Sequence, residues 1–215
     1  MDLTESVKAE AISAKQPKQL YLLFFAEMWE RFSFYGMKAL LIAYMTSQLN
    51  YDDPKAYAIL GSYAALVYTM PMFGGFMADR FLGYRRAIIF GGILMTLGHL
   101  ILALPNDWSF FFGMAFIICG NGFFKPNISS LVGTLYSEND PRRDSGFSIF
   151  YMGINIGAAI GGALCAYIGT KINWHYGFGL AAIFMFIGLV VFVIGKNSLG
   201  NKGLPPNEIA LNKPV

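Results

Sequence analysis

Four ionisable side chains lie within twelve residues of a strongly apolar segment near the amino terminus. The segment reads FFAEMWERFSFYGMKALL from residue 24. If it is helical, its spacing places one set of side chains on a single face: Glu27, Glu30, Arg31, Phe34, Tyr35 and Lys38. An ionisable group in hydrocarbon costs roughly 3 kcal/mol or more. This face is therefore expected to meet protein or a water-filled cavity.

Two acids beside one base favour proton chemistry. Glu27 and Arg31 are spaced to form an ion pair, which leaves Glu30 to find another partner. A carboxylate held between burial, which favours its neutral form, and a guanidinium, which favours its charged form, can take up and release a proton. We interpret Glu27, Glu30 and Arg31 as a proton-coupling group. A static ion-pair network that fastens helices together is the alternative.

A second buried cation follows in the segment CGNGFFKPNISS, where Lys125 precedes Pro126. Proline removes a backbone hydrogen bond and can bend a helix. The alternative for Lys125 is that its side chain extends to the membrane interface. Counting ~1.5 Å per residue from the ends of their segments puts Lys125, Tyr68 and Asn155 at depths similar to that of Arg31. These residues are therefore expected to share one site.

The residue types in this site indicate which solute it would bind. Arg31 and Lys125 can donate hydrogen bonds to a carboxylate, and the two acids suit a proton or an ammonium group. Tyr35, Tyr68 and Asn155 can bond amides. A zwitterionic solute that contains amides fits all three groups. These residues alone do not separate a short peptide from an amino acid or another organic anion.

The elements that position these residues are membrane helices. Of the 215 residues, 55% are hydrophobic and 13% are charged. Six runs of about 20 residues, the length that crosses a bilayer, are nearly free of charge: 20–47, 56–79, 86–104, 110–132, 146–169 and 174–195. The sequence therefore predicts an all-α membrane protein with six transmembrane helices over 20–195. A polar leader covers 1–19 and a polar connector covers 196–215.

The sequence shows no motif typical of a metal-binding protein, a nucleic-acid-binding protein or an enzyme. Cys119 and Cys165 lie inside apolar runs without metal-ligand spacing, and no basic run suits nucleic acid. His99 and His175 are isolated, and the sequence shows no nucleophile with a base and no phosphate loop. We expect neither an enzyme nor a metal site, and no cofactor other than protons as the coupling ion.

The distribution of Lys and Arg predicts the orientation in the membrane. Eleven of the sixteen lie on one side: Lys8, Lys15, Lys18, Arg80, Arg85, Arg86, Arg142, Arg143, Lys196, Lys202 and Lys213. Only Lys55 and Lys171 lie on the other. Because positive charge marks the cytoplasmic side, both termini of a protein in the cytoplasmic membrane are expected to face the cytoplasm.

Two further motifs concern movement and packing. GINIGAAIGGALCA, from residue 153, spaces small residues so that helices can approach closely. GGFMADRFLGYRR, over 74–86, joins two runs and holds a predicted conformational loop: Asp79, Arg80, Gly83, Arg85 and Arg86. Asp79 can cap a helix or pair across this loop, and such contacts can break and reform as a transporter moves.

These motifs together resemble those of the proton-dependent oligopeptide transporters of the major facilitator superfamily. EMWERFSFYG (27–36) is similar to the family's ExxERFxYYG, and 74–86 resembles its loop signature. GNGFFKPNISSLVGTLY (120–136) and FYMGINIGA (150–158) resemble its fourth- and fifth-helix signatures. The resemblance covers nearly the whole chain.

The resemblance implies proton symport of di- and tripeptides. It implies that Glu27 and Glu30 act in proton coupling, and it places a peptide among Arg31, Tyr35, Tyr68, Lys125 and Asn155. It also implies that Lys38 pairs with an acid on a seventh helix in a gate. That acid belongs to a carboxyl-terminal six-helix half, which is not in this sequence and would complete the pocket. Phe34 departs from the family motif, which has a tyrosine there, and this removes one hydroxyl from the pocket.

Two alternatives remain open from the sequence. A family relative with the same residues could carry nitrate, amino acids or another organic anion instead of peptides. A six-helix chain of this kind could also act as a membrane subunit that does not transport.

Overall fold

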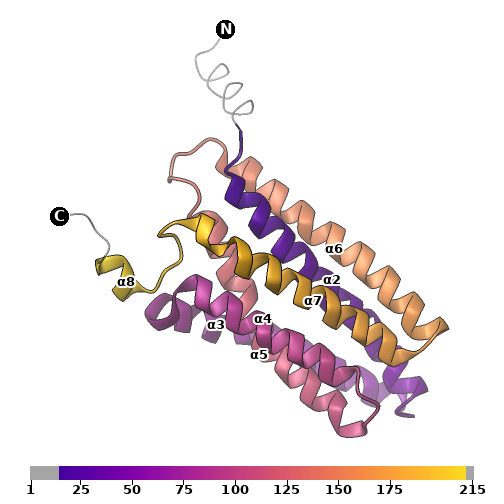
Figure 1. Ribbon diagram of the computed structural model, residues 1–215. Helices are drawn as coiled ribbons and strands as arrows, with labels where there is room; N and C mark the ends of the chain where they lie inside the picture. Colours follow the sequence, from indigo (N-terminus) through magenta and orange to yellow (C-terminus); the bar gives the residue numbers. More distant parts are fainter. Residues whose placement is uncertain (1–14, 212–215) are drawn as a thin grey trace.

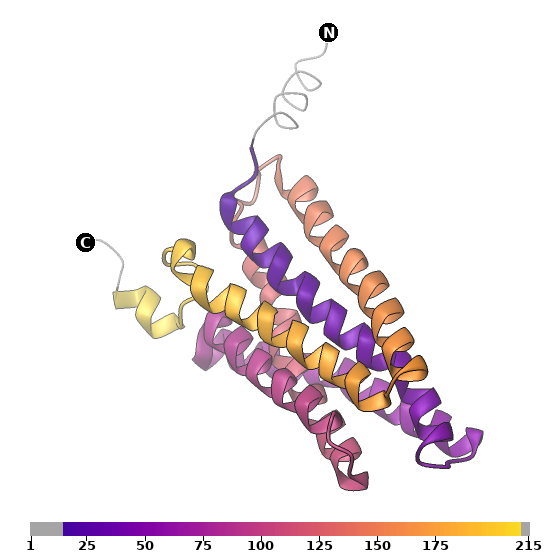
Figure 2. The ribbon, with the colours of Figure 1, turned by 45° about the vertical axis from the view of Figure 1, so that its right-hand side comes forward.

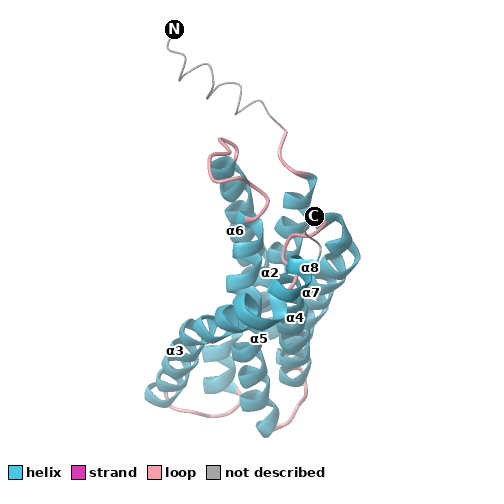
Figure 3. Cartoon of the chain, turned by 90° about the vertical axis from the view of Figure 1, so that its left-hand side faces the viewer, coloured by secondary structure: helices cyan, strands magenta, loops and turns pink. Residues whose placement is uncertain are grey.

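The computed structural model describes residues 15–211, and these form helices joined by short connections (Figure 3). There are six long helices: α2 (Lys18–Ser47), α3 (Asp53–Met77), α4 (Gly83–Leu102), α5 (Asp107–Gly133), α6 (Arg143–Lys171) and α7 (Trp174–Gly195). Three short helical turns complete the set: η1 (Ala78–Leu82), η2 (Lys196–Leu199) and α8 (Pro206–Leu211). Each of the six predicted apolar runs forms one long helix, with ends that differ from the prediction by at most three residues.

Four helical stretches within residues 15–211 are long and apolar enough to cross a membrane. The first spans Asp53–Leu102 because η1 and Gly83 connect α3 directly to α4 with no longer loop between them, and Gly83, at φ +72°, turns the chain from one helix into the next. The others correspond to α5, α6 and α7. α2 is not in this set, and its four ionisable side chains account for that. They lower the apolar content of a helix that is as long as its neighbours.

The helices pack in pairs that relate the first three to the last three. α2 packs along α6 and against α7, and α5 packs along α3 and α4. α4 and α7 also touch. Exchange of α2, α3 and α4 with α5, α6 and α7 maps this set of contacts onto itself, as expected for two three-helix repeats. Figures 1 and 2 show α2 and α6 lying side by side along most of their lengths.

Small residues permit the close approach of α6 to α2. Gly157 and Gly161 are buried. A Cβ atom added at Gly157 would overlap the backbone of Met28, and one at Gly161 would overlap the backbone of Phe32. The packing interpretation of this glycine motif therefore agrees with the structure. It brings α6 against the part of α2 that carries the ionisable residues.

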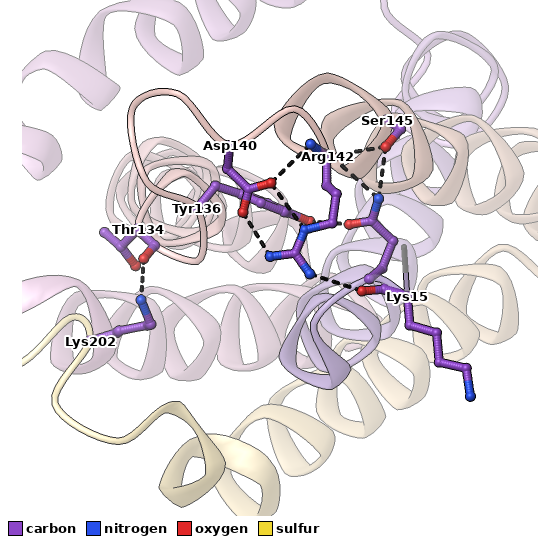
Figure 4. Close-up of polar contacts among 8 residues, drawn as sticks. Lys15, Thr134, Tyr136, Asp140, Arg142, Ser145 and Lys202 are labelled. Atoms are coloured by element: carbon purple, nitrogen blue, oxygen red, sulfur yellow. Dashed lines mark hydrogen bonds and ion pairs between the residues drawn. The ribbon is translucent and has the colours of Figure 1, made fainter. Parts of the chain in front are cut away.

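A polar network joins the start of α2 to the loop between α5 and α6 (Figure 4). The side chain of Gln16 donates to Ser145 Oγ at 2.7 Å and accepts from the Tyr136 hydroxyl at 2.8 Å. Arg142 donates to both carboxylate oxygens of Asp140, at 3.0 and 2.8 Å. These hydrogen bonds lower the pKa of Asp140 to about 2. The network fixes where α2 enters the bundle.

Candidate functional site

The predicted proton-coupling residues form one buried cluster on α2. Glu27, Glu30 and Arg31 are at most 2% exposed. Arg31 Nε lies 3.2 Å from Glu27 Oε1, which confirms the expected ion pair. Glu30 has another partner, as expected, because Asn121 Nδ2 donates to its Oε1 at 3.3 Å. It also shares Arg31, which the spacing did not predict: Arg31 Nη2 donates to Glu30 Oε1 at 2.6 Å, and Arg31 Nε donates to Glu30 Oε2. One guanidinium therefore serves both acids.

This cluster has one more acid than base, which makes it responsive to a proton. With all three groups ionised it carries one excess negative charge, and burial makes such a charge costly. Glu27 Oε2 has no hydrogen-bond partner among the described residues, whereas both oxygens of Glu30 are bonded. Binding a proton or bringing a second cation nearby would relieve the excess.

A narrow pocket adjoins the cluster between α2, α3 and α5. Its volume is about 20 Å³, and nine residues line it: Arg31, Phe34, Tyr35, Lys38, Tyr63, Ala64, Val67, Tyr68 and Lys125. Four of the five predicted substrate-binding residues are therefore brought together. Ligand pockets usually have roughly 300–1,000 Å³, so this pocket by itself is too small to enclose such a ligand.

The cations in this pocket lie beside aromatic rings. Lys125 Nζ is 5.8 Å from the centre of the Tyr68 ring, and Arg31 Cζ is 5.1 Å from the centre of the Phe34 ring. Lys125 lines the pocket, which favours the site interpretation over extension to the interface. Tyr68 is 73% exposed, so one side of the pocket is open. The pocket lining holds three cations and three tyrosine hydroxyl groups, which suit an anionic, amide-containing solute.

Asn155 and Lys38 lie differently from the other predicted residues. Asn155 is exposed on α6, donates to the carbonyl of Tyr151 at 3.1 Å, and does not line the pocket. Its contact with substrate stays a prediction. Lys38 lines the pocket and also, with Tyr35, a second cavity against α6. Its pairing with an acid in a gate stays a prediction.

Sequence reasoning missed two polar residues at the site. Asn121 on α5 is fully buried, and its Nδ2 donates to Glu30 Oε1 at 3.3 Å. Tyr63 on α3 lines the pocket and is 3% exposed. A signal for Asn121 was present, because it precedes Lys125 by four residues and so lies on the same helical face. Within residues 15–211, no group of three acidic, His or Cys side chains is placed to hold a metal ion.

The predicted conformational loop forms the turn between α3 and α4. Gly83 has φ +72°, which favours glycine, and a Cβ atom there would overlap the backbone of Leu204 and Pro205. Asp79 bonds the Tyr84 side chain, which agrees with pairing across the turn. Arg80 lies 5.9 Å from the centre of the Phe76 ring.

The arginines of this turn hold the connector. Arg85 donates to the carbonyls of Lys202 at 2.6 Å and Gly200 at 2.5 Å. Arg86 pairs with Glu208 at 2.6 Å. The connector therefore folds back onto the turn, which its composition did not indicate. Whether these contacts change during function stays a prediction.

Comparison with known proteins gives the family. Residues 85–213 match the model of the POT family. The chain belongs to this family. POT proteins are membrane transporters rather than enzymes, so the chain is part of a multi-pass membrane protein.

Individual relatives show what part of a POT protein the chain represents. It is 47% identical over 197 residues to a di-/tripeptide transporter of Lactococcus lactis subsp. lactis, covering 88% of this chain and 40% of that protein. A peptide transporter POT solved with alafosfalin is 47% identical with a TM-score of 0.84, covering 91% of this chain and 43% of the other. A POT family transporter solved with 5-aminolevulinic acid is 44% identical with a TM-score of 0.86, covering 89% and 41%. The chain spans 39–40% of the length of the curated relatives it matches.

Proposed function

We propose that this chain is the amino-terminal half of a proton-coupled symporter of di- and tripeptides. In this proposal two six-helix halves alternate access to a site between them. Membership of the POT family, a relative named as a di-/tripeptide transporter, and coverage of about two fifths of the relatives support it. The carboxyl-terminal half supplies the other wall of the pocket.

The observation that carries the proposal is the contact between a cationic pocket and a buried acid cluster. Arg31 belongs to both, because it lines the pocket and bonds Glu27 and Glu30. A substrate carboxylate that draws on Arg31 and Lys125 weakens the hold of Arg31 on the acids, and the acids then favour a bound proton. This shared guanidinium gives a physical reason for proton and substrate to move together.

The same pocket suits small zwitterions, so substrate identity needs a direct comparison. The solved relative bound to 5-aminolevulinic acid holds a molecule with an amine and a carboxylate but no peptide bond. Tyr35 and Tyr68 remain as hydroxyl groups for the amide of a peptide, while Phe34 contributes none. We therefore place peptides first and test other solutes beside them.

Orientation and topology are part of the proposal. All six long helices cross the membrane, with the polar face of α2 turned to its neighbours. Lys15, the α5–α6 loop and the connector lie at the same end of the bundle, as shown by hydrogen bonds from Arg142 to the Lys15 carbonyl and from Lys202 to the Thr134 carbonyl (Figure 4). We place this end, and both termini, in the cytoplasm because it carries most of the Lys and Arg.

The test uses the full-length protein that contains this chain, reconstituted in liposomes. We expect an inward proton gradient to drive accumulation of radiolabelled dialanine, and unlabelled di- and tripeptides to compete for it. Nitrate, single amino acids and 5-aminolevulinic acid serve as comparison solutes. The proposal would be overturned if dialanine uptake were the same with and without the proton gradient. It would also be overturned if a comparison solute accumulated and dialanine did not.

A further inference from the structure

Asn121 is the only side chain of α5 that the described residues show bonded to the acid cluster of α2. Its Nδ2 donates to Glu30 Oε1 at 3.3 Å, and its Oδ1 has no hydrogen-bond partner within the described part of the chain. Asn121 is fully buried. In most buried side-chain amides both the NH₂ group and the carbonyl oxygen are hydrogen-bonded. An amide that bonds a carboxylate through its nitrogen and leaves its oxygen unbonded therefore needs an explanation.

The chemistry of the two groups supplies one. An ionised carboxylate only accepts hydrogen bonds, and the amide nitrogen is a donor that suits it. A protonated carboxyl group donates through its O–H, and it needs an acceptor such as an amide oxygen. Rotation of the Asn121 amide by half a turn exchanges the donor for the free Oδ1. The same side chain can therefore bond Glu30 in either protonation state.

We propose that Asn121 is a positioning residue that responds to the protonation state of Glu30 and passes it to the substrate pocket. Lys125 lies four residues further along α5, on the same helical face, and lines the pocket. A change at Glu30 thus acts on the helix that carries a substrate-binding cation. This inference rests on the proposed proton-coupled transport.

Other charged or titratable groups also act on Glu30. Glu27 and Arg31 lie beside it on α2. Tyr63 approaches from α3, and its hydroxyl has no hydrogen-bond partner in the described part of the structure. Lys125 on α5 acts on the same cluster through Glu27. Asn121 differs from the charged groups because it is neutral and can switch from donor to acceptor without a change of charge. It differs from Tyr63 because it is hydrogen-bonded to Glu30.

The test compares two buried asparagines of α5 in the full-length protein. Asn121→Leu removes a hydrogen bond to each form of Glu30, and the bond to the ionised form is the stronger of the two because one partner is charged. We expect the pH at which dialanine uptake is half-maximal to rise by about one unit, which is a tenfold change in proton concentration. Asn121→Asp, which keeps the size of the side chain, places a second carboxylate beside Glu30 and is expected to shift the midpoint in the same direction.

Asn127→Leu is the matched control. Asn127 is equally buried on the same helix, but it donates only to the backbone carbonyls of Phe123 and Gly74. Its loss is expected to lower stability and leave the pH midpoint within about 0.3 units of wild type. If both Asn121 variants keep the wild-type midpoint, or if Asn127→Leu moves it as far as they do, Asn121 is only a packing residue.

Failure of this inference is distinguishable from failure of the proposed function. Counterflow, in which labelled dialanine exchanges for internal dialanine, needs no proton gradient. A wild-type protein with neither uptake nor counterflow of dialanine would remove the transport proposal itself. Wild-type transport with a pH profile that Asn121 variants leave unchanged would remove only the role of Asn121.

Discussion

Two adjacent glycines of α6 permit a sharp test of how α2 is positioned. Gly161 faces α2, and a Cβ atom there would lie against the O, C and Cα atoms of Phe32. Gly162 lines the cavity between α6 and α2, and a Cβ atom there would have nothing within 4 Å. The same substitution, Gly→Ala, therefore meets backbone at one position and open space at the next.

The magnitudes follow from these surroundings. Overpacking a close contact costs about 1–3 kcal/mol, and backbone atoms of a helix cannot rotate away as a side chain can. Alanine in place of glycine inside a helix contributes about 0.5–1 kcal/mol of stability. We expect Gly161→Ala to destabilise the protein by roughly 2 kcal/mol. Gly162→Ala should stabilise it slightly or leave it unchanged.

Thermal unfolding of the full-length protein in detergent measures this difference, and dialanine uptake measures its functional consequence. Phe32 follows Arg31 directly, so a displaced backbone at Phe32 also moves the guanidinium that holds both acids. Gly161→Ala should therefore lose proton-driven uptake as well as stability, while Gly162→Ala keeps both. Equal unfolding temperatures for the two variants would show that α6 does not approach α2 as described.

Three further predictions address the site and the polar network beside it. Glu27→Gln should abolish uphill accumulation of dialanine and retain counterflow, and normal accumulation would exclude a coupling role. Lys125→Ala should lower peptide uptake at least tenfold, because the loss of a charged hydrogen bond costs about 1.5–3 kcal/mol. Wild-type affinity and rate in this variant would instead indicate that the Lys125 side chain extends to the membrane interface. Asp140→Asn should lower the unfolding temperature near neutral pH. Because Arg142 lowers the pKa of Asp140 to about 2, this deficit should shrink as the pH falls from about 4 towards 2, and a deficit independent of pH would argue against the ion pair.

The long helices were predictable because their cause is local. A run of about 20 apolar residues without charge can satisfy its backbone in hydrocarbon only as a helix, so length and composition fix each segment. The π-helical turn η1 at the end of α3 was not predictable from these rules. It depends on Gly83 and on the connector that packs against it, which lie more than 100 residues apart in the sequence.

Helical spacing and depth placed Arg31, Tyr35, Tyr68 and Lys125 at one site, and all four line the pocket, but Asn155, placed there by the same reasoning, does not. That reasoning also missed Tyr63 and Asn121. Helical spacing correctly paired Glu27 with Arg31, but it gave no reason to pair Arg31 with its immediate neighbour Glu30. Burial supplies that reason. Both carboxylates are removed from water, and a guanidinium has five N–H donors, so Arg31 can bond both of them. Asn121 bonds Glu30 from another helix, α5. Residue spacing within one helix cannot predict which residues of α5 lie opposite Glu30, because that depends on how the two helices pack.

The two parts of the site differ in how far this chain completes them. Glu27 and Glu30 are fully enclosed by its own helices, whereas Tyr68 is 73% exposed and the pocket has about 20 Å³. Under the proposed function, the free energy of binding a proton is therefore set by packing within this chain, which is why a glycine on α6 and an asparagine on α5 are expected to alter coupling. In the proposed transporter the carboxyl-terminal half supplies the opposite wall, so exchanging that half between POT relatives should change substrate preference more than pH dependence.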